Sequence, residues 1–177
     1  MQKKSFDEYY KPAEDTLFLA DIIQNEKGKT ALDIGTGSGF LAKILTDNFE
    51  FVVATDINFS ALKKAHEVVK NCICCNAADA LNCNFDLVVC NLPYLPSEEI
   101  TDPAVDGLAE GLGVTTNIIK SASKVVRQNG KLVYLTSSLA NYQELVRRTE
   151  SLGFSVRIMA KKKLFFEELV LVECVKL

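Results

Sequence analysis

A short apolar segment that runs straight into a glycine-rich turn constrains the fold of this chain more than any other feature. Residues 30–34 (Thr-Ala-Leu-Asp-Ile) have the length and apolar character of a buried strand, and the sequence Gly-Thr-Gly-Ser-Gly follows at residues 35–39. Glycines at such a turn let the backbone pass close to a ligand, where a Cβ atom would collide. A helix is expected at residues 40–47. A strand, a glycine turn and a helix in this order predict a parallel sheet that binds a ligand beyond the carboxyl end of its first strand.

The rest of the chain alternates between strand-like and helix-like periodicity, which is typical of βαβ units. Further strands are expected at residues 50–55, 72–75, 85–90 and 131–136, and further helices at residues 12–27, 58–70, 114–127 and 140–152. After Gly153 the helical pattern stops, and two strands, 154–160 and 164–175, are expected with the lysines at 161–163 joining them. We therefore expect an α/β fold in one domain spanning residues 1–177. It should have a mostly parallel, twisted sheet with helices on both faces and a C-terminal antiparallel β-hairpin.

The composition indicates a soluble protein of the cytoplasm. Hydrophobic residues make up 48% of the chain and charged residues 24%, so a packed core is expected rather than disorder. No apolar run approaches the roughly 18 residues that a membrane-spanning helix needs. The N-terminal residues include two lysines but lack the apolar stretch of a secretory signal.

The charge balance argues against a nucleic-acid partner. The net charge is −3, and the basic clusters, at residues 147–148 and 161–163, are short enough to be solvated faces. A protein that grips the phosphates of duplex nucleic acid usually presents a basic face. Direct binding of nucleic acid is therefore disfavoured.

The six cysteines are interpreted as free thiols and not as a metal site. Cys72 and Cys75 have the spacing of half a zinc site, but no second ligand pair follows, and the sole histidine, His66, lies in a predicted helix. Most of the cysteines fall in predicted buried strands, where cysteine behaves as a small hydrophobe. We expect no metal ligands, and free thiols fit a reducing compartment.

Polar side chains stand at or just beyond the ends of the first four predicted strands: Asp33, Asp56, Asp79 and Asn91. In an open parallel sheet these ends meet at one edge, where ligands bind. A carboxylate at Asp56 can accept both hydroxyls of a ribose, and Asp79 can accept a hydrogen bond from an adenine amino group. The alternative for Asp33 and Asp56 is ordinary turn chemistry at strand ends.

Two classes of adenosine cofactor fit this pattern. The spacing of Gly37, Gly39 and Ala42 satisfies a relaxed dinucleotide fingerprint, with Asp56 near the position that it requires, so a nicotinamide-dependent oxidoreductase stays open. Asp33 favours S-adenosylmethionine, because its carboxylate can meet the ammonium of the methionine part but would repel a pyrophosphate. The terminal hairpin also fits a methyltransferase better than a dehydrogenase, which would normally need a further substrate domain.

The segment Asn91-Leu92-Pro93-Tyr94 directly follows the fourth predicted strand and is the most specific feature of the sequence. The Asn91 side-chain oxygen and a backbone carbonyl of Leu92 or Pro93 can accept hydrogen bonds from a planar NH₂ group, whose nitrogen lone pair is delocalised. Pro93 holds the preceding carbonyl extended, and the Tyr94 ring offers a flat face. The alternative is a proline-marked turn. We interpret Asn91, Pro93 and Tyr94 as the catalytic residues of a methyl transfer to an amide or exocyclic amino nitrogen.

This segment resembles the (Asn/Asp/Ser)-Pro-Pro-(Tyr/Phe/Trp) signature of methyltransferases that act on planar nitrogens, with Leu92 in place of the first proline. Residues 10–16 (Tyr-x-Pro-Ala-Glu-Asp-Thr), the glycine turn and residues 104–107 (Ala-Val-Asp-Gly) extend the likeness. Together they resemble the release-factor glutamine N5-methyltransferases, and more narrowly their short archaeal and eukaryotic branch. The resemblance covers the chain from about Tyr9 to its end. It implies the class I methyltransferase fold, which is Rossmann-like.

The resemblance implies S-adenosylmethionine as methyl donor and, as acceptor, the glutamine of the Gly-Gly-Gln motif in a translation release factor. It also implies a small zinc-binding activator subunit along the sheet edge. Asn91 and Pro93 would bind the acceptor amide, with Tyr94 against it. The residues that it implies at the cofactor are Thr16, Asp33, Gly35, Gly37, Asp56, Asp79, Ala80 and Asn91.

Other functions stay open at this point. An N6-adenine or N2-guanine methyltransferase would act on the same flat amino group, although the acidic chain and the lack of a target-recognition domain argue against it. A non-catalytic adaptor would have no need of Asn91, Pro93 and Tyr94. An oxidoreductase predicts binding of NADH and none of S-adenosylmethionine.

Overall fold

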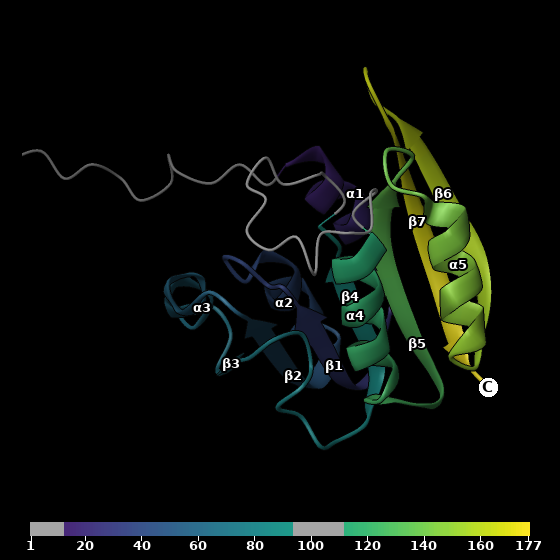
Figure 1. The fold of residues 1–177 in the computed structure, drawn as a ribbon. Helices are drawn as coiled ribbons and strands as arrows, with labels where there is room; N and C mark the ends of the chain where they lie inside the picture. Colours follow the sequence, from purple (N-terminus) through teal and green to yellow (C-terminus); the bar gives the residue numbers. More distant parts are fainter. Residues whose placement is uncertain (1–12, 94–111) are drawn as a thin grey trace, which may run out of the picture.

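The computed structural model describes residues 13–93 and 112–177, which form one seven-stranded sheet with helices against both faces (Figure 1). The strands are β1 (Gly28–Ile34), β2 (Phe49–Asp56), β3 (Asn71–Cys74), β4 (Phe85–Asn91), β5 (Val126–Ser137), β6 (Phe154–Lys163) and β7 (Glu168–Lys176). The helices are α1 (Glu14–Ile23), α2 (Phe40–Leu45), α3 (Phe59–Ala65), α4 (Leu112–Ser123) and α5 (Tyr142–Ser151). None of the helices in these two ranges is long and apolar enough to cross a membrane.

The strand order in the sheet is β3-β2-β1-β4-β5-β7-β6. β1 pairs in parallel with β2 on one side and with β4 on the other, and parallel pairing continues outward to β3 and β5. β7 pairs antiparallel with both β5 and β6, so the last two strands form the expected hairpin. The prediction of a mostly parallel sheet with a terminal antiparallel hairpin, as in the class I methyltransferase fold, is confirmed.

Two apolar layers, one on each face of the sheet, hold the helices in place. On one face, Ile119 of α4 and Leu145 of α5 pack with buried sheet residues such as Leu32. On the other face, Leu19 of α1 and Leu41 of α2 pack into a second buried cluster. Figure 1 accordingly shows α4 and α5 in front of the sheet and α1 and α2 behind it. Side chains alternate along each strand, so one central strand supplies both layers.

The helix expected to reach Arg127 ends at Ser123, and Val126 already belongs to β5. Asn129 and Gly130, expected to stop the helix, lie inside the strand. Asn129 has a φ of +61°, and the pairing of β4 with β5 changes register at its start. An Asn-Gly pair can bend a strand as well as end a helix, because both turns use a backbone conformation that these residues adopt readily.

The lysines at 161–163 lie in β6 and do not form the turn of the hairpin. The turn consists of residues 164–167 and is closed by a 2.8 Å hydrogen bond from Leu164 N to Glu167 O. β6 is the edge strand of the sheet, where charged side chains keep an open edge in water. The first helix ends early as well, at Ile23, and Gly28 begins β1 instead of following the helix directly.

The prediction that most cysteines are buried is wrong. The buried cysteines are Cys90 and Cys174, the half-buried ones Cys72 and Cys75, and the exposed ones Cys74 and Cys83, all as free thiols. Three of the accessible thiols lie in or next to β3, which is the other edge strand and pairs on one side only in the part of the chain that the structure describes. Within the described residues, no group of three or more His, Cys, Asp or Glu side chains could hold a metal ion.

Gly39 and Gly37 offer a matched test of packing at the glycine turn. Both have a positive φ, +86° and +56°, but a Cβ on Gly39 would lie 2.9 Å from the Cα of Ala65 in α3, whereas one on Gly37 would meet nothing within 4 Å. We expect Gly39→Ala to lower the free energy of unfolding by about 2–4 kcal/mol and Gly37→Ala by about 1–2 kcal/mol, since the first adds overpacking to backbone strain. Urea denaturation measures both values. Equal losses would contradict a steric role for the contact with α3.

Candidate functional site

The glycine turn is held against the end of the neighbouring strand by its own backbone. Gly35 N and Thr36 N both donate to the carbonyl oxygen of Thr55, at 2.9 Å each. Gly37 N donates to the Asp56 carboxylate at 2.9 Å. The turn that follows β1 is therefore fixed to the carboxyl end of β2, which brings the predicted residues of the first two strands together.

Two of the three glycines leave open space on the outer side of the turn. Gly35 and Gly37 have φ values of +71° and +56°, and a Cβ at either position would meet nothing within 4 Å. Their backbone therefore forms a shallow cradle that side chains of the described protein do not fill. Gly39 differs, because it packs closely on α3 and brings the start of α2 against it.

Asp33 is buried beneath this cradle, with 1% of its surface exposed. One carboxylate oxygen accepts from the Thr36 hydroxyl at 2.6 Å and from Ala42 N at 3.1 Å. The other oxygen is buried and has no hydrogen-bond partner among the residues that the structure describes. Burial raises the pKa of Asp33 to about 7, and repulsion from Asp56 adds to the shift. A buried acceptor without a donor is uncommon and suits an ammonium group brought by a ligand.

Asp56 ends β2 and joins the turn to the next helix. Its oxygens accept from Gly37 N at 2.9 Å and from Asn58 N at 2.8 Å. Asn58 in turn caps α3 by accepting from Ser60 N and Ala61 N. A carboxylate has about four acceptor positions, so Asp56 keeps capacity for the hydroxyls of a ligand.

Asp79 lies beyond β3 in an exposed turn that is tied to α4. Its carboxylate accepts from the Ser121 hydroxyl at 2.5 Å, and the same hydroxyl accepts from Ala78 N at 3.1 Å. Ala80 follows and is exposed. Ser121 therefore fixes this turn from a helix 42 residues away in the chain, a contact that no local pattern in the sequence indicates.

The orientation of the Asn91 amide is determined by α1. Asn91 Nδ2 donates to the Asp15 carboxylate at 3.1 Å and to the Thr16 hydroxyl at 3.4 Å. A carboxylate only accepts hydrogen bonds, so the amide nitrogen has to face Asp15 and the amide oxygen has to face away from it. That oxygen, Oδ1, is buried and has no partner within the described parts of the chain. Asp15, which in the sequence is one residue of the 10–16 motif with no role of its own, thus sets which atom of Asn91 is available.

A cleft of about 470 Å³ joins the glycine turn to the segment after β4. The residues that line it are Asp15, Ile34, Gly35, Cys90, Asn91, Leu92, Pro93 and Ile118. It thus contains Gly35, Asn91 and Pro93 of the predicted set. The other described residues of the predicted set, Thr16, Asp33, Gly37, Asp56, Asp79 and Ala80, are not part of its lining. Tyr94 and residues 104–107 lie outside the described residues.

Two further cleft residues carry information that the sequence alone does not give. Leu92 is 2% exposed, and its N–H donates to Leu135 O at 3.2 Å, so this residue extends the pairing of β4 with β5. Pro93 follows it as an exposed residue at the cleft. Burial raises the pKa of the Cys90 thiol far above its ordinary value, and the neighbouring Asp33 charge adds to this effect. Cys90 therefore contributes a neutral, inert wall.

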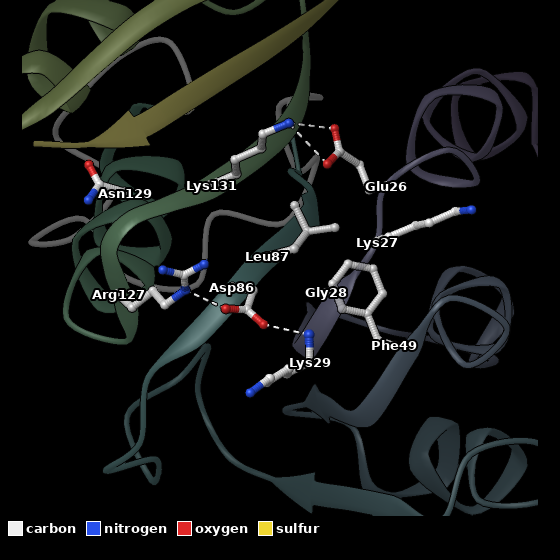
Figure 2. A pocket seen from close by; sticks show the side chains of 10 residues that line it. All are labelled: Glu26, Lys27, Gly28, Lys29, Phe49, Asp86, Leu87, Arg127, Asn129 and Lys131. Carbon is white, nitrogen blue, oxygen red and sulfur yellow. Dashed lines mark hydrogen bonds and ion pairs between the residues drawn. The ribbon is translucent and has the colours of Figure 1, made fainter.

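A second pocket, of about 520 Å³, lies at the opposite end of the sheet, where β1, β2 and β4 begin (Figure 2). Ion pairs join its walls: Lys131 with Glu26 at 2.8 Å, and Arg127 with Asp86. Burial raises the pKa of Asp86, but hydrogen bonds from two backbone N–H groups of β1 and from Arg127 outweigh it and leave the pKa below its ordinary value. None of the predicted site residues lines this pocket. The ion pairs in this pocket link the elements at the end of the sheet where these strands begin.

Comparison with known proteins identifies the family of this chain. The methyltransferase small domain family matches residues 12–166. A protein of Methanocaldococcus jannaschii, provisionally named a protein N5-glutamine methyltransferase, is 30% identical and covers 96% of this chain and 93% of its own length. The release factor glutamine methyltransferase of Streptococcus pneumoniae is 29% identical over 68% of this chain, which spans 51% of that enzyme.

A solved structure matches the fold along nearly the whole chain. It is the E. cuniculi Mtq2–Trm112 complex, described as responsible for methylation of the translation termination factor eRF1. The TM-score is 0.78 at 28% identity, covering 95% of this chain and 98% of the matched one. The chain therefore belongs to the methyltransferase small domain family, among the protein N5-glutamine methyltransferases, and its cofactor is S-adenosylmethionine.

Proposed function

We propose that this enzyme methylates the side-chain amide nitrogen, N5, of the glutamine in the Gly-Gly-Gln motif of a translation release factor. The observation that carries the proposal is the buried Oδ1 of Asn91, which has no hydrogen-bond partner among the described residues and belongs to the same cleft as Gly35 of the glycine turn. An acceptor oxygen at this place suits a substrate that brings an NH₂ group. A glutamine amide is such a substrate, and the relatives named above support the choice.

The residues around the glycine turn fit S-adenosylmethionine part by part. Asp33 Oδ1, which no described residue contacts by a hydrogen bond, suits the ammonium of the methionine part, and the open cradle at Gly35 and Gly37 admits the chain that carries this ammonium. Asp56 has acceptor positions left for the ribose hydroxyls. We assign Asp79 and Ala80 to the adenine and Thr16, beside Asn91, to the methionine end. When bound, the cofactor supplies an electrophilic methyl group.

The acceptor residues raise the reactivity of an amide nitrogen whose lone pair is delocalised. Asn91 Oδ1 accepts one N–H of the glutamine, and a carbonyl of Leu92 or Pro93 accepts the other. These two bonds aim the nitrogen at the methyl group and stabilise the positive charge that develops on it. Pro93 keeps the carbonyl before it in an extended conformation. Tyr94, which lies outside the described residues, is proposed as the aromatic residue for the amide. The proton of the methylated nitrogen leaves to water.

Asp15 acts as a positioning residue in this scheme. Its carboxylate, 3.1 Å from Asn91 Nδ2, excludes the flipped amide in which nitrogen would face the substrate. A flipped amide would present a donor to the donor NH₂ of glutamine, and both would lose a partner. The helix start at Glu14–Thr16 thereby contributes to the acceptor site through a side chain that need not touch the substrate.

The activator subunit is part of the proposal as well. The related E. cuniculi protein forms a complex with Trm112, and β3 leaves one edge of the sheet unpaired within the described structure. Large apolar side chains are exposed on β2, α3 and the segments next to them: Phe51, Ile57, Phe59 and Val68. We infer that a small zinc-binding partner covers this edge. A release factor as substrate and accessible free thiols both fit the cytoplasm.

An amino group on adenine or guanine would fit the same acceptor atoms, so one experiment has to separate the substrates. We expect label from radioactive S-adenosylmethionine to enter a release factor and to be absent when the glutamine of its Gly-Gly-Gln motif is changed to alanine. The enzyme is tested alone and with a Trm112-like subunit, with DNA and ribosomal RNA as parallel acceptors. Label that persists on the Gln→Ala factor, or enters nucleic acid instead, would overturn the proposed substrate.

The effects of substituting Asn91 and Asp15 on turnover should be coupled. Asn91→Ala should lower turnover about 10²-fold or more, the scale of losing one aligned hydrogen bond, and leave cofactor affinity within a few-fold. Asp15→Asn keeps shape but lets the Asn91 amide flip, and should lower turnover about 10-fold. In the Asn91→Ala background, Asp15→Asn should have no further effect. Additive losses in this cycle would contradict the positioning role.

Asp33 should release a proton when the cofactor binds. In the free enzyme its pKa is about 7, and a cation beside it lowers that pKa, so binding just below pH 7 converts the acid to the carboxylate. The affinity for the cofactor should rise with pH up to about pH 7 and then stay constant. Calorimetry at pH 6.5 in two buffers of different ionisation enthalpy counts the protons. If the Asp33→Asn variant releases the same number of protons on binding the cofactor, the proton comes from another group.

A further inference from the structure

Two adjacent aromatic side chains stand almost fully in water at the turn of the C-terminal hairpin. Phe165 is 92% exposed and Phe166 is 87% exposed. Their rings contact each other edge to face, with centroids 4.6 Å apart. Large aromatic groups with so little cover usually mark a binding surface, because any polar residue would suit the turn better.

The turn that carries the rings is held by hydrogen bonds on several sides. Leu164 N donates to Glu167 O at 2.8 Å, and the Glu167 carboxylate accepts from the Ser137 hydroxyl. Glu168 N donates to the Ser138 hydroxyl at 2.9 Å. The hairpin tip is thus tied to the end of β5, and its rings are presented from a fixed backbone. An anchor arranged in this way loses little entropy when it binds.

The hairpin tip lies at the same end of the sheet as the cleft. Asn91 of β4 pairs with Leu135 of β5, and Leu135 pairs with Leu171 of β7. Phe166 lies five residues before Leu171 in the chain. Strand dimensions put Phe166 roughly 20 Å from Asn91. Figure 1 shows the hairpin extending past α1 at this end. Lys162 of β6 forms an ion pair with Glu14 of α1 at 3.4 Å.

We propose that Phe165 and Phe166 anchor the release factor outside the acceptor cleft, an inference that rests on the proposed function. A single glutamine side chain is too small to reach from Asn91 to the tip. A protein contact of about 800 Å² per partner is roughly 30 Å across and covers both places. The rings therefore fit an apolar pocket on the folded factor that surrounds its Gly-Gly-Gln loop.

The position in the sheet separates this anchor from the activator surface. The proposed activator covers the β3 edge, whereas the tip belongs to β6 and β7 at the opposite edge. Two lysines near the tip are already in ion pairs, Lys161 with Glu168 at 2.8 Å and Lys162 with Glu14. An apolar contact therefore suits the tip better than an ionic one.

The test compares a folded substrate with a short one. The double variant Phe165→Ser/Phe166→Ser is assayed as full-length enzyme, with the activator if the wild type needs it. For the intact release factor, KM should rise about tenfold or more, the usual effect of removing aromatic anchors, and kcat should stay within about twofold. For a peptide of a dozen residues around Gly-Gly-Gln, KM should not change. Cofactor affinity and the unfolding midpoint should match the wild type.

Leu177→Ser is the matched control, because Leu177 is 73% exposed and follows β7 at the far end of the sheet. It should leave KM for the factor unchanged. If the double variant leaves KM for the factor unchanged, the anchor proposal is wrong and the proposed function still stands. The same holds if KM rises equally for the factor and the peptide. A wild-type dimer that becomes monomeric in the double variant would assign the rings to a second copy and overturn the anchor proposal too. If the wild type does not methylate the factor, the proposed function fails, and the anchor with it.

Discussion

The parallel pairing of β1 on both of its flanks is the constraint on which the site depends. β2 and β4 both lie beside β1 and run in its direction, so the chain leaves the sheet three times on the same side, at the carboxyl ends of these strands. At these ends the backbone turns away from its neighbours, and Asp33, Asp56 and Asn91 arrive from three separate parts of the sequence. The glycine turn is short enough to donate to Thr55 and Asp56 of the next strand, which keeps this side compact. Position in the sheet, more than any single contact, brings the chemistry together.

The buried side-chain oxygens that lack a hydrogen-bond partner within the described structure include one carboxylate oxygen and one amide oxygen at this end of the sheet, Asp33 Oδ1 and Asn91 Oδ1. An unsatisfied buried acceptor costs about 1–3 kcal/mol, so two of them near one cleft are a real load on folding stability. Each is kept in place by partners on its other atom: Thr36 and Ala42 hold Asp33, and Asp15 holds Asn91. Stability is given up where ligand groups are to be recognised, as is common at active sites.

The sequence predicts the strands that are apolar throughout, because a central parallel strand has to be buried on both faces. It also predicts the glycine turn and Asn91, since both depend on residues that are adjacent in the chain. It does not predict Asp15 as the partner of Asn91 or Ser121 as the partner of Asp79, because these contacts join residues far apart in sequence.

Element ends and burial at the sheet edges are harder to read for a physical reason. Asn129 and Gly130 can serve a helix end or a bend in a strand, and only the pairing of β4 with β5 decides between them. Cysteines in an apolar segment look buried, but Cys74 lies on an edge strand with no neighbour on one side in the described structure. Tertiary contacts decide both cases, and periodicity does not report them.

Leu92 changes how the segment after β4 is kept stiff. Its N–H donates to Leu135 O, a rung that a proline at this position could not form. In this chain the conformation of residues 91–93 therefore depends on the hydrogen-bonded pairing of β4, β5 and β7, and not on a second proline ring. Heat or denaturant that frays this pairing reaches the carbonyls beside Pro93 directly, so the reactive geometry and the integrity of the sheet decline together.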